Sequence, residues 1–289
     1  MKKIVIAVVS LLFGLALLGC EDNAQTFNQV PPAPQGVFSV TGDRSVEIVW
    51  NGVYDRDVSY YAVYRSNQAT TGYAEIGRVT SLDNPNLDLI IYNYFDNTVS
   101  NGTTYYYAVS AVDRAGQESS LSAEEVFDTP RPEGMTALYS YYVDSSRAGF
   151  DLAGVAARVP WPSLSADVWI DDAGGAFYIN AADTLTDLQD LGFTQNFEEI
   201  GYSPDSGWSE VGYFELIAGH TYVIWTRDNH FAKMRVESIN GLTGQVVFQW
   251  AYQTDTGNPE LAPGFPGAEK PSHGPEYLRA PGTSITNNM

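Results

Sequence analysis

Histidine and cysteine, which often serve as bases, nucleophiles and metal ligands, are scarce in this chain: its 289 residues include three histidines and one cysteine. A serine hydrolase needs a histidine within reach of a positioned nucleophile. No nucleophile-elbow string and no phosphate-binding glycine loop accompanies His220, His230 or His273. Histidines with the close spacing of a zinc site are also missing. The histidines therefore predict neither a hydrolase triad nor a zinc centre.

Acidic side chains offer two adjacent pairs, Asp171-Asp172 and Glu198-Glu199. Neighbouring residues of a strand point to opposite faces, so neither pair converges on one substrate by itself. Asp167 lies near the first pair and a Gly-Gly step, but this group lacks the ligand spacing of a known calcium loop. We therefore expect solvated acids, no bound metal and no enzymatic activity.

The single cysteine, Cys20, follows an apolar run at residues 4–19 that two lysines precede. This is the layout of a secretory signal. As a helix the run would span about 24 Å, which is less than the ~30 Å hydrocarbon core of a membrane. The residues Leu17-Leu18-Gly19-Cys20 resemble the bacterial lipobox, which implies cleavage before Cys20 and its acylation; two or more acyl chains form a stable anchor. The alternative is an ordinary signal peptide with an incidental cysteine.

Glu21 and Asp22 resemble the short acidic export signal of surface lipoproteins in Bacteroidota-type bacteria, although a solvated tether would look the same. We predict a signal peptide at residues 1–19 and a flexible tether at 20–30. The resemblance implies a bacterial cell-envelope protein held at the outer membrane, on either its periplasmic face or the cell surface. The lipid bilayer would be its partner through acylated Cys20.

The composition gives a formal net charge of −20, from 35 acidic and 15 basic residues. Such a surface repels nucleic acid and anionic lipid, so we expect no nucleic-acid partner. One cysteine cannot form a disulfide within the chain, so packed cores must stabilise the fold. Hydrophobic residues make up 44% and aromatic residues 13% of the chain, which favours β-rich domains, and this length is typical of two.

Residues 31–130 read as short strands, with alternation that places Val46, Ile48 and Trp50 on one face. The proline-rich entry, Trp50, the string YYAVYR and the string NGTTYYYAVSAVD together resemble a fibronectin type III domain. The resemblance implies an immunoglobulin-like sandwich of two sheets with a tyrosine corner at Tyr105.

Residues 135–253 predict a second, mainly antiparallel β domain. The string TYVIWTRDNHFAKMRV indicates a hairpin with Ala232, Met234 and Val236 inward and Lys233 and Arg235 in solvent. Leucines at every third position predict one short helix over residues 184–191. The tail at 254–289 is rich in proline and glycine, and we expect it to be disordered.

The hairpin string and the following VVFQWAYQ resemble HmuY-like lipoproteins, which implies haem binding through a pair of His or Met side chains. No pair of His or Met side chains in this sequence can be aligned with those ligands. His220 and His230 lie at opposite ends of the predicted hairpin, about 20 Å apart at ~3.3 Å per residue. His230 with Met234 is no better placed. We therefore predict no cofactor and keep haem binding as an alternative.

The favoured hypothesis is a non-catalytic binding or adhesion protein whose partner is an extracellular glycan, protein or haem. Exposed aromatic side chains could stack on sugar rings or peptide. The candidates are Trp161, Trp208 and Trp225; we expect at least half of them to be core residues and Trp208 to be exposed. His230 is a further candidate binding residue. The second alternative is an accessory or catalytic component of extracellular polysaccharide hydrolysis.

Overall fold

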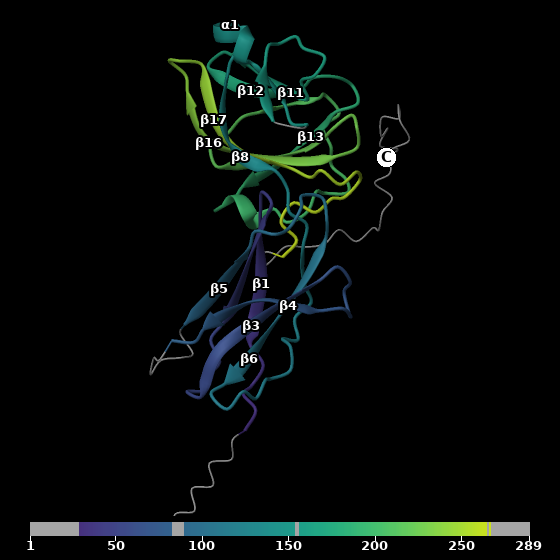
Figure 1. The fold of residues 1–289 in the computed structure, drawn as a ribbon. Helices are drawn as coiled ribbons and strands as arrows, with labels where there is room; N and C mark the ends of the chain where they lie inside the picture. Colours follow the sequence, from purple (N-terminus) through teal and green to yellow (C-terminus); the bar gives the residue numbers. More distant parts are fainter. Residues whose placement is uncertain (1–28, 83–89, 154–155, 265, 267–289) are drawn as a thin grey trace, which may run out of the picture.

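The computed structural model describes residues 29–82, 90–153, 156–264 and 266. They form two β-sandwiches joined end to end, and the described chain begins at the end of the first sandwich that faces away from the second (Figure 1). Cys20 and the predicted signal peptide lie outside the described residues. Within the described ranges, no helix combines the length and apolarity that a membrane crossing requires.

The first sandwich has the two-sheet arrangement expected of a fibronectin type III domain. Its smaller sheet has the order β1 (Gln35–Gly42), β2 (Ser45–Asn51) and β5 (Ile91–Asp96). Its larger sheet has the order β4 (Ala74–Thr80), β3 (Val58–Ser66), β6 (Tyr105–Asp113) and β7 (Val126–Asp128). All neighbouring strands are antiparallel.

Alternation along the strands fills the first core as predicted. Val46, Ile48 and Trp50 are fully buried, and the Trp50 ring packs edge-on against Tyr61 with 5.6 Å between centroids. The predicted tyrosine corner is present, because the Tyr105 hydroxyl accepts a hydrogen bond of 3.2 Å from the backbone N–H of Ser100.

The second sandwich consists of two five-stranded sheets. The outer sheet, which lies farthest from the first sandwich, has the order β10 (Ala157–Val159), β9 (Gly149–Asp151), β11 (Val168–Ala173), β12 (Ala176–Ala181) and β14 (Tyr213–Glu215). The inner sheet has the order β13 (Asp187–Phe193), β15 (His220–Trp225), β16 (Phe231–Asn240), β17 (Gln245–Tyr252) and β8 (Glu133–Tyr139). Both are antiparallel throughout.

The short helix was predicted in the wrong place. Residues 187–193 form β13, and the helix is instead α1 (Tyr141–Asp144), whose N-cap Ser140 accepts a hydrogen bond from Tyr142 N–H. Leucines three apart mimic a helix here because both faces of β13 are covered. Leu188 lies in the core between the sheets, whereas Leu191 packs into a second apolar cluster on the opposite face.

The residues on that opposite face were predicted incorrectly in the β15–β16 hairpin, where Lys233 and Arg235 were expected to lie in solvent. Ala232, Met234 and Val236 point inward as predicted. Lys233 is not solvated: it is completely buried, and its ammonium donates to the carbonyl oxygens of Phe197 (2.7 Å) and Ile200 (3.2 Å). The Arg235 side chain is only 13% exposed. The segment after β13, which includes the short 3₁₀ helix η3 (Phe197–Glu199), covers the face that a lone hairpin would show to solvent.

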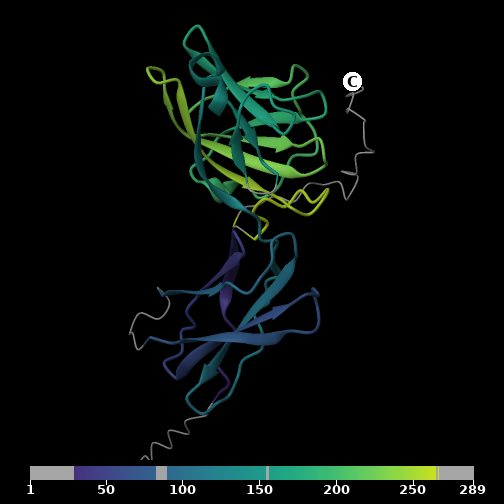
Figure 2. The same cartoon turned by 45° about the horizontal axis from the view of Figure 1, so that its top comes forward.

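The predicted disorder from residue 254 is wrong for residues 254–264. Leu261 and Ala262 are fully buried, and both of their N–H groups donate to the carbonyl oxygen of Gly201. This segment, yellow in Figures 1 and 2, runs along the junction of the two sandwiches. There the Thr129 hydroxyl donates to the Glu260 carboxylate. The prolines prevent regular strands, yet the apolar side chains between them still pack.

Candidate functional site

The outer sheet carries a group of partly exposed aromatic side chains on the surface that faces away from the core. We call it the aromatic face, and it consists of Tyr141, Trp161, Trp169, Tyr178 and Tyr213. The alternation of β11 and β12 explains it, because Val168, Ile170, Phe177 and Ile179 point into the core and leave their neighbours outside.

Trp161 and Trp169 form the centre of the aromatic face. Their rings are stacked with 4.9 Å between centroids and 7° between planes, and both are half-buried. Tyr141, at the start of α1, meets the Trp169 ring edge-on at 6.1 Å. The backbone N–H of Trp161 donates to the carbonyl oxygen of Ser145 (2.8 Å), and this hydrogen bond fixes the loop that carries the Trp161 ring.

A polar and aromatic row continues across the sheet from Trp169. Trp169 pairs with Asn180 on β12, and Asn180 pairs with Tyr213 on β14. Paired residues share a face, and two strand spacings of ~4.8 Å separate the ends of the row by about 10 Å. Asn180 also donates to the Asp171 carboxylate (3.1 Å). The row is comparable in length with a disaccharide.

A groove of ≈ 680 Å³ lies along this row. Its lining includes Trp169, Asn180 and Tyr213 from the strands, together with two connecting segments. The first is the turn at residues 183–187, and the second is the loop at residues 208–212.

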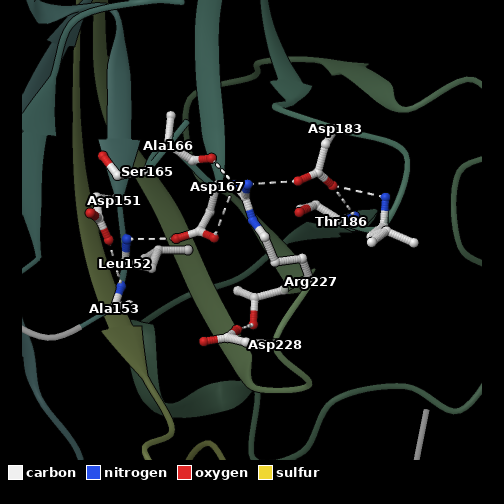
Figure 3. Close-up of polar contacts among 12 residues, drawn as sticks. Asp151, Leu152, Ala153, Ser165, Ala166, Asp167, Asp183, Thr186, Arg227 and Asp228 are labelled. Atoms are coloured by element: carbon white, nitrogen blue, oxygen red, sulfur yellow. Dashed lines mark hydrogen bonds and ion pairs between the residues drawn. The ribbon is translucent and has the colours of Figure 1, made fainter. Parts of the chain in front are cut away.

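Arg227 connects two segments, the loop that carries Trp161 and the turn at residues 183–187 (Figure 3). Its guanidinium donates to the carbonyl oxygens of Leu164 (3.1 Å) and Ala166, and it forms an ion pair of 2.9 Å with Asp183. Asp183 in turn accepts hydrogen bonds from the N–H groups of the turn residues 185 and 186. One side chain from the β15–β16 hairpin thus positions both the loop that carries Trp161 and the turn at residues 183–187.

Asp167, also in Figure 3, lies deeper in the same network. Its carboxylate accepts a hydrogen bond from Leu152 N–H (2.8 Å) and lies 3.7 Å from Arg227. Burial raises the pKa of Asp167 to about 6. The Asp167 side chain is only 7% exposed and is not among the residues that line the groove, so it supports the neighbouring loop and does not itself contact a ligand in the groove.

The predicted exposure of Trp208 is wrong, and Trp225 is a core residue and not a binding residue on the surface. Trp208 is 6% and Trp225 is 2% exposed, and both lie in the second apolar cluster with Phe231 and Leu261. The glycines and polar residues around Trp208 suggested an open turn, but the 254–264 segment covers it. One edge of Trp208 still contributes to the lining of the groove.

His230 is mostly buried, with 16% of its side chain exposed. Its ring contacts the Tyr252 hydroxyl through Nδ1 and the Thr256 hydroxyl through Nε2 (2.8 Å). Burial lowers its pKa. His220 lies at the other end of the hairpin and pairs with Asp190 (3.0 Å), while Met234 is inside the core. These three candidate haem ligands therefore do not form a pair in the structure, and His273 lies outside the described residues.

The acidic residues considered as metal ligands are also dispersed. Asp171 contacts Asn180, whereas Asp172 accepts a hydrogen bond from Ser140 on the other side of the strand. Across the described residues, no group of three or more His, Cys, Asp or Glu side chains is arranged to hold a metal ion.

The chemistry available on the aromatic face is recognition. Flat apolar rings provide stacking surfaces, and the carboxylates, amide and hydroxyls beside them offer hydrogen bonds. Of its residues, only Trp161 was singled out as a candidate from the sequence. The signal for Trp169 was present, because a tryptophan between two inward-facing residues of a strand must point outward. No local signal joins Tyr141 and Tyr213 to it, since they lie far away in the sequence.

No known protein-family profile matches this chain. The amylopullulanase of Thermoanaerobacterium saccharolyticum is 28% identical over 142 residues, which cover 49% of this chain and 10% of that protein. The amylopullulanase of Thermoanaerobacter thermohydrosulfuricus is 38% identical over 96 residues, which cover 32% of this chain and 6% of that protein. This chain thus spans a tenth or less of the length of these relatives.

Two solved structures are also similar. A fibronectin type III-like protein from Clostridium thermocellum is 31% identical and aligns over 37% of this chain and 100% of its own, with a TM-score of 0.29. A β-1,2-glucanase from Parabacteroides distasonis is 29% identical over 35% of this chain and 13% of its own, with a TM-score of 0.27. The strand order of the first sandwich is fibronectin type III-like, and segments of this chain are similar to parts of larger proteins.

Proposed function

We propose that this protein is a non-catalytic polysaccharide-binding protein of the bacterial cell envelope, which assists extracellular polysaccharide hydrolysis by retaining the substrate. The observation that carries the proposal is the stacked pair Trp161 and Trp169 on the aromatic face, with Asn180 and Tyr213 in register beside it. Aromatic rings bind the apolar faces of sugars, and neighbouring polar groups bind their hydroxyls.

The similarity to amylopullulanases supports the same proposal. Each matched segment covers a tenth or less of the relative's length, which is the proportion of an accessory segment and not of a whole enzyme. We therefore assign substrate retention to this chain and hydrolysis to a separate catalytic protein.

The orientation of the two sandwiches fits an anchored binding protein. The described chain begins at the outer end of the first sandwich, whereas α1 and strands β11 and β12 lie at the opposite end of the molecule (Figure 1). Acyl chains on Cys20 would thus place the aromatic face away from the bilayer, with the fibronectin type III-like module as a spacer.

Affinity electrophoresis in gels that contain soluble polysaccharides tests the binding proposal. Wild-type protein should be retarded by at least one neutral polysaccharide. Trp169→Ala should lose most of that retardation, because it removes both the stack with Trp161 and the ring at the groove. Tyr54→Ala is the control, since Tyr54 is a 74% exposed ring on the first sandwich. No retardation by any polysaccharide, or equal loss in both variants, contradicts the proposal.

The anchor needs its own test. Metabolic labelling with a radioactive fatty acid should mark the wild-type protein, and Cys20→Ala should abolish the label and release the protein from the membrane fraction. An unlabelled wild-type protein would remove the anchor from the proposal while leaving polysaccharide binding intact.

A further inference from the structure

We infer that the groove beside Trp169 binds an uncharged, hydroxyl-rich glycan and rejects acidic polysaccharides. The inference rests on the proposed function and adds the class of ligand. It draws on two observations that are independent of the stacked rings: buried polar atoms without a hydrogen-bond partner in two residues that line the groove, and the charge of the lining.

Two side chains that line the groove bury a polar atom without a hydrogen-bond partner among the described residues. They are the indole nitrogen of Trp208 and the hydroxyl of Thr186. Trp208 is 6% and Thr186 is 3% exposed. A buried polar atom without a partner costs free energy, and such atoms are rare in folded proteins. Two of them in one groove indicate that a bound molecule completes their hydrogen bonds.

The polar groups of the groove define what that molecule must offer. An indole N–H only donates, so the ligand needs an acceptor beside Trp208. The carboxylates of Asp183 and Glu210 only accept when ionised, so the ligand needs donors beside them. The sugar hydroxyl group combines both properties and can satisfy all of these residues. Trp169 and Tyr213 provide rings for the apolar faces of the same sugar units.

The charge of the lining selects against acidic sugars. Asp183, Asp187 and Glu210 line the groove, and no Lys, Arg or His side chain of the described residues lines it. Arg227, which does not line the groove, forms an ion pair with Asp183. A uronate or sulfate group would lie beside carboxylates in a partly desolvated groove, where like charges repel strongly. Neutral hexose or pentose units avoid this repulsion.

Isothermal titration of the full chain with neutral and acidic oligosaccharides tests the inference. The neutral probes are maltohexaose, cellohexaose, mannohexaose and xylohexaose, and the acidic probes are oligogalacturonate and a heparin oligosaccharide. At least one neutral probe should bind at moderate salt, and neither acidic probe should. Thr186→Val and Trp208→Phe should each weaken the neutral probe about three- to tenfold, because each removes one hydrogen bond.

Stability measurements separate binding from folding. Thr186→Val keeps the shape of the side chain and removes an unpartnered hydroxyl, so its Tm should be unchanged or higher. Thr243→Val, at an exposed turn of the β16–β17 hairpin, is the matched control and should change neither affinity nor Tm.

Four outcomes would overturn the inference. The first is that acidic probes bind as tightly as neutral ones, which would show that the groove does not select against acidic sugars. The second is that neutral binding survives both Thr186→Val and Trp208→Phe unchanged while Trp169→Ala abolishes it, which would show that the aromatic face binds glycan without the groove. If Trp169→Ala also leaves binding unchanged, or no probe binds, the proposed function fails as well.

Discussion

Trp208 packs against Trp225 with 5.6 Å between ring centroids, on the side of the inner sheet that faces away from the main core. Phe231 and Leu261 complete this second apolar cluster. The cluster supports the loop at residues 208–212, so the stability of the second sandwich and the shape of the groove depend on the same tryptophan.

Replacing Trp208 with alanine should lower the free energy of unfolding of the second sandwich by about 3–5 kcal/mol, the usual cost of removing a large buried aromatic ring. Urea denaturation monitored by circular dichroism measures the change. Tyr54→Ala, at a 74% exposed position, should cost less than about 0.5 kcal/mol. Equal, small effects of the two substitutions would show that the cluster contributes little to stability.

The segment that follows β17 should behave as part of the second sandwich. Leu261 is fully buried, so Leu261→Ala should destabilise by about 2–5 kcal/mol in the same denaturation experiment. Leu242→Ala offers a comparison at a completely exposed leucine and should be close to neutral. A neutral Leu261→Ala would mean that residues 254–264 do not pack in solution.

Asp128 should give the first sandwich a pH-dependent stability. It is completely buried and accepts a hydrogen bond of 2.7 Å from Thr41, and burial raises its pKa to about 6, from the ordinary aspartate value of 3.8. Between these values the folded state binds more protons than the unfolded state. The stabilising contribution is therefore fully present below about pH 4 and is lost as the pH rises through 6.

Asp128→Asn isolates this contribution, because an amide keeps an acceptor for Thr41 but does not ionise. From pH 4 to pH 8, the stability of the variant relative to wild type should rise by up to roughly 3 kcal/mol. Urea unfolding at pH 4, 6 and 8 provides the measurement. Parallel pH profiles for the two proteins would refute a raised pKa at this residue.

Arg227→Gln should weaken both folding and glycan binding. The substitution removes charged hydrogen bonds to Leu164 and Ala166 and leaves Asp183 without its ion-pair partner, at an expected cost of about 1–3 kcal/mol in stability. Binding measured under conditions where both proteins are fully folded should still be weaker, since the loop of Trp161 and the turn at residues 183–187 lose their common support.

Arg158→Gln provides the matched control for Arg227, because Arg158 is an exposed arginine of the same sandwich, on β10 of the outer sheet. It should leave stability and binding unchanged. If Arg227→Gln lowers stability but folded protein binds glycan normally, Arg227 has a structural role only and does not position the site.

The fold class and the core-facing residues of the first sandwich could be predicted from the sequence. Val46, Ile48 and Trp50 alternate with polar residues, and a half-buried strand with one apolar face is the structure that buries such a pattern. The inward face of β16 was equally predictable from Ala232, Met234 and Val236. In each case the information lies within one strand, where the periodicity of two reports which side faces the core.

The segments that cover the opposite faces of these strands could not be predicted, because they are distant in the sequence. Alternation places Lys233 opposite the core, but distant residues 197–201 bury it there. Trp208 lies in a glycine-rich loop and is nevertheless covered by Leu261. The stack of Trp161 on Trp169 and the groove between residues 183–187 and 208–212 arise in the same way, because segments far apart in the sequence meet. Local periodicity carries no information about such contacts.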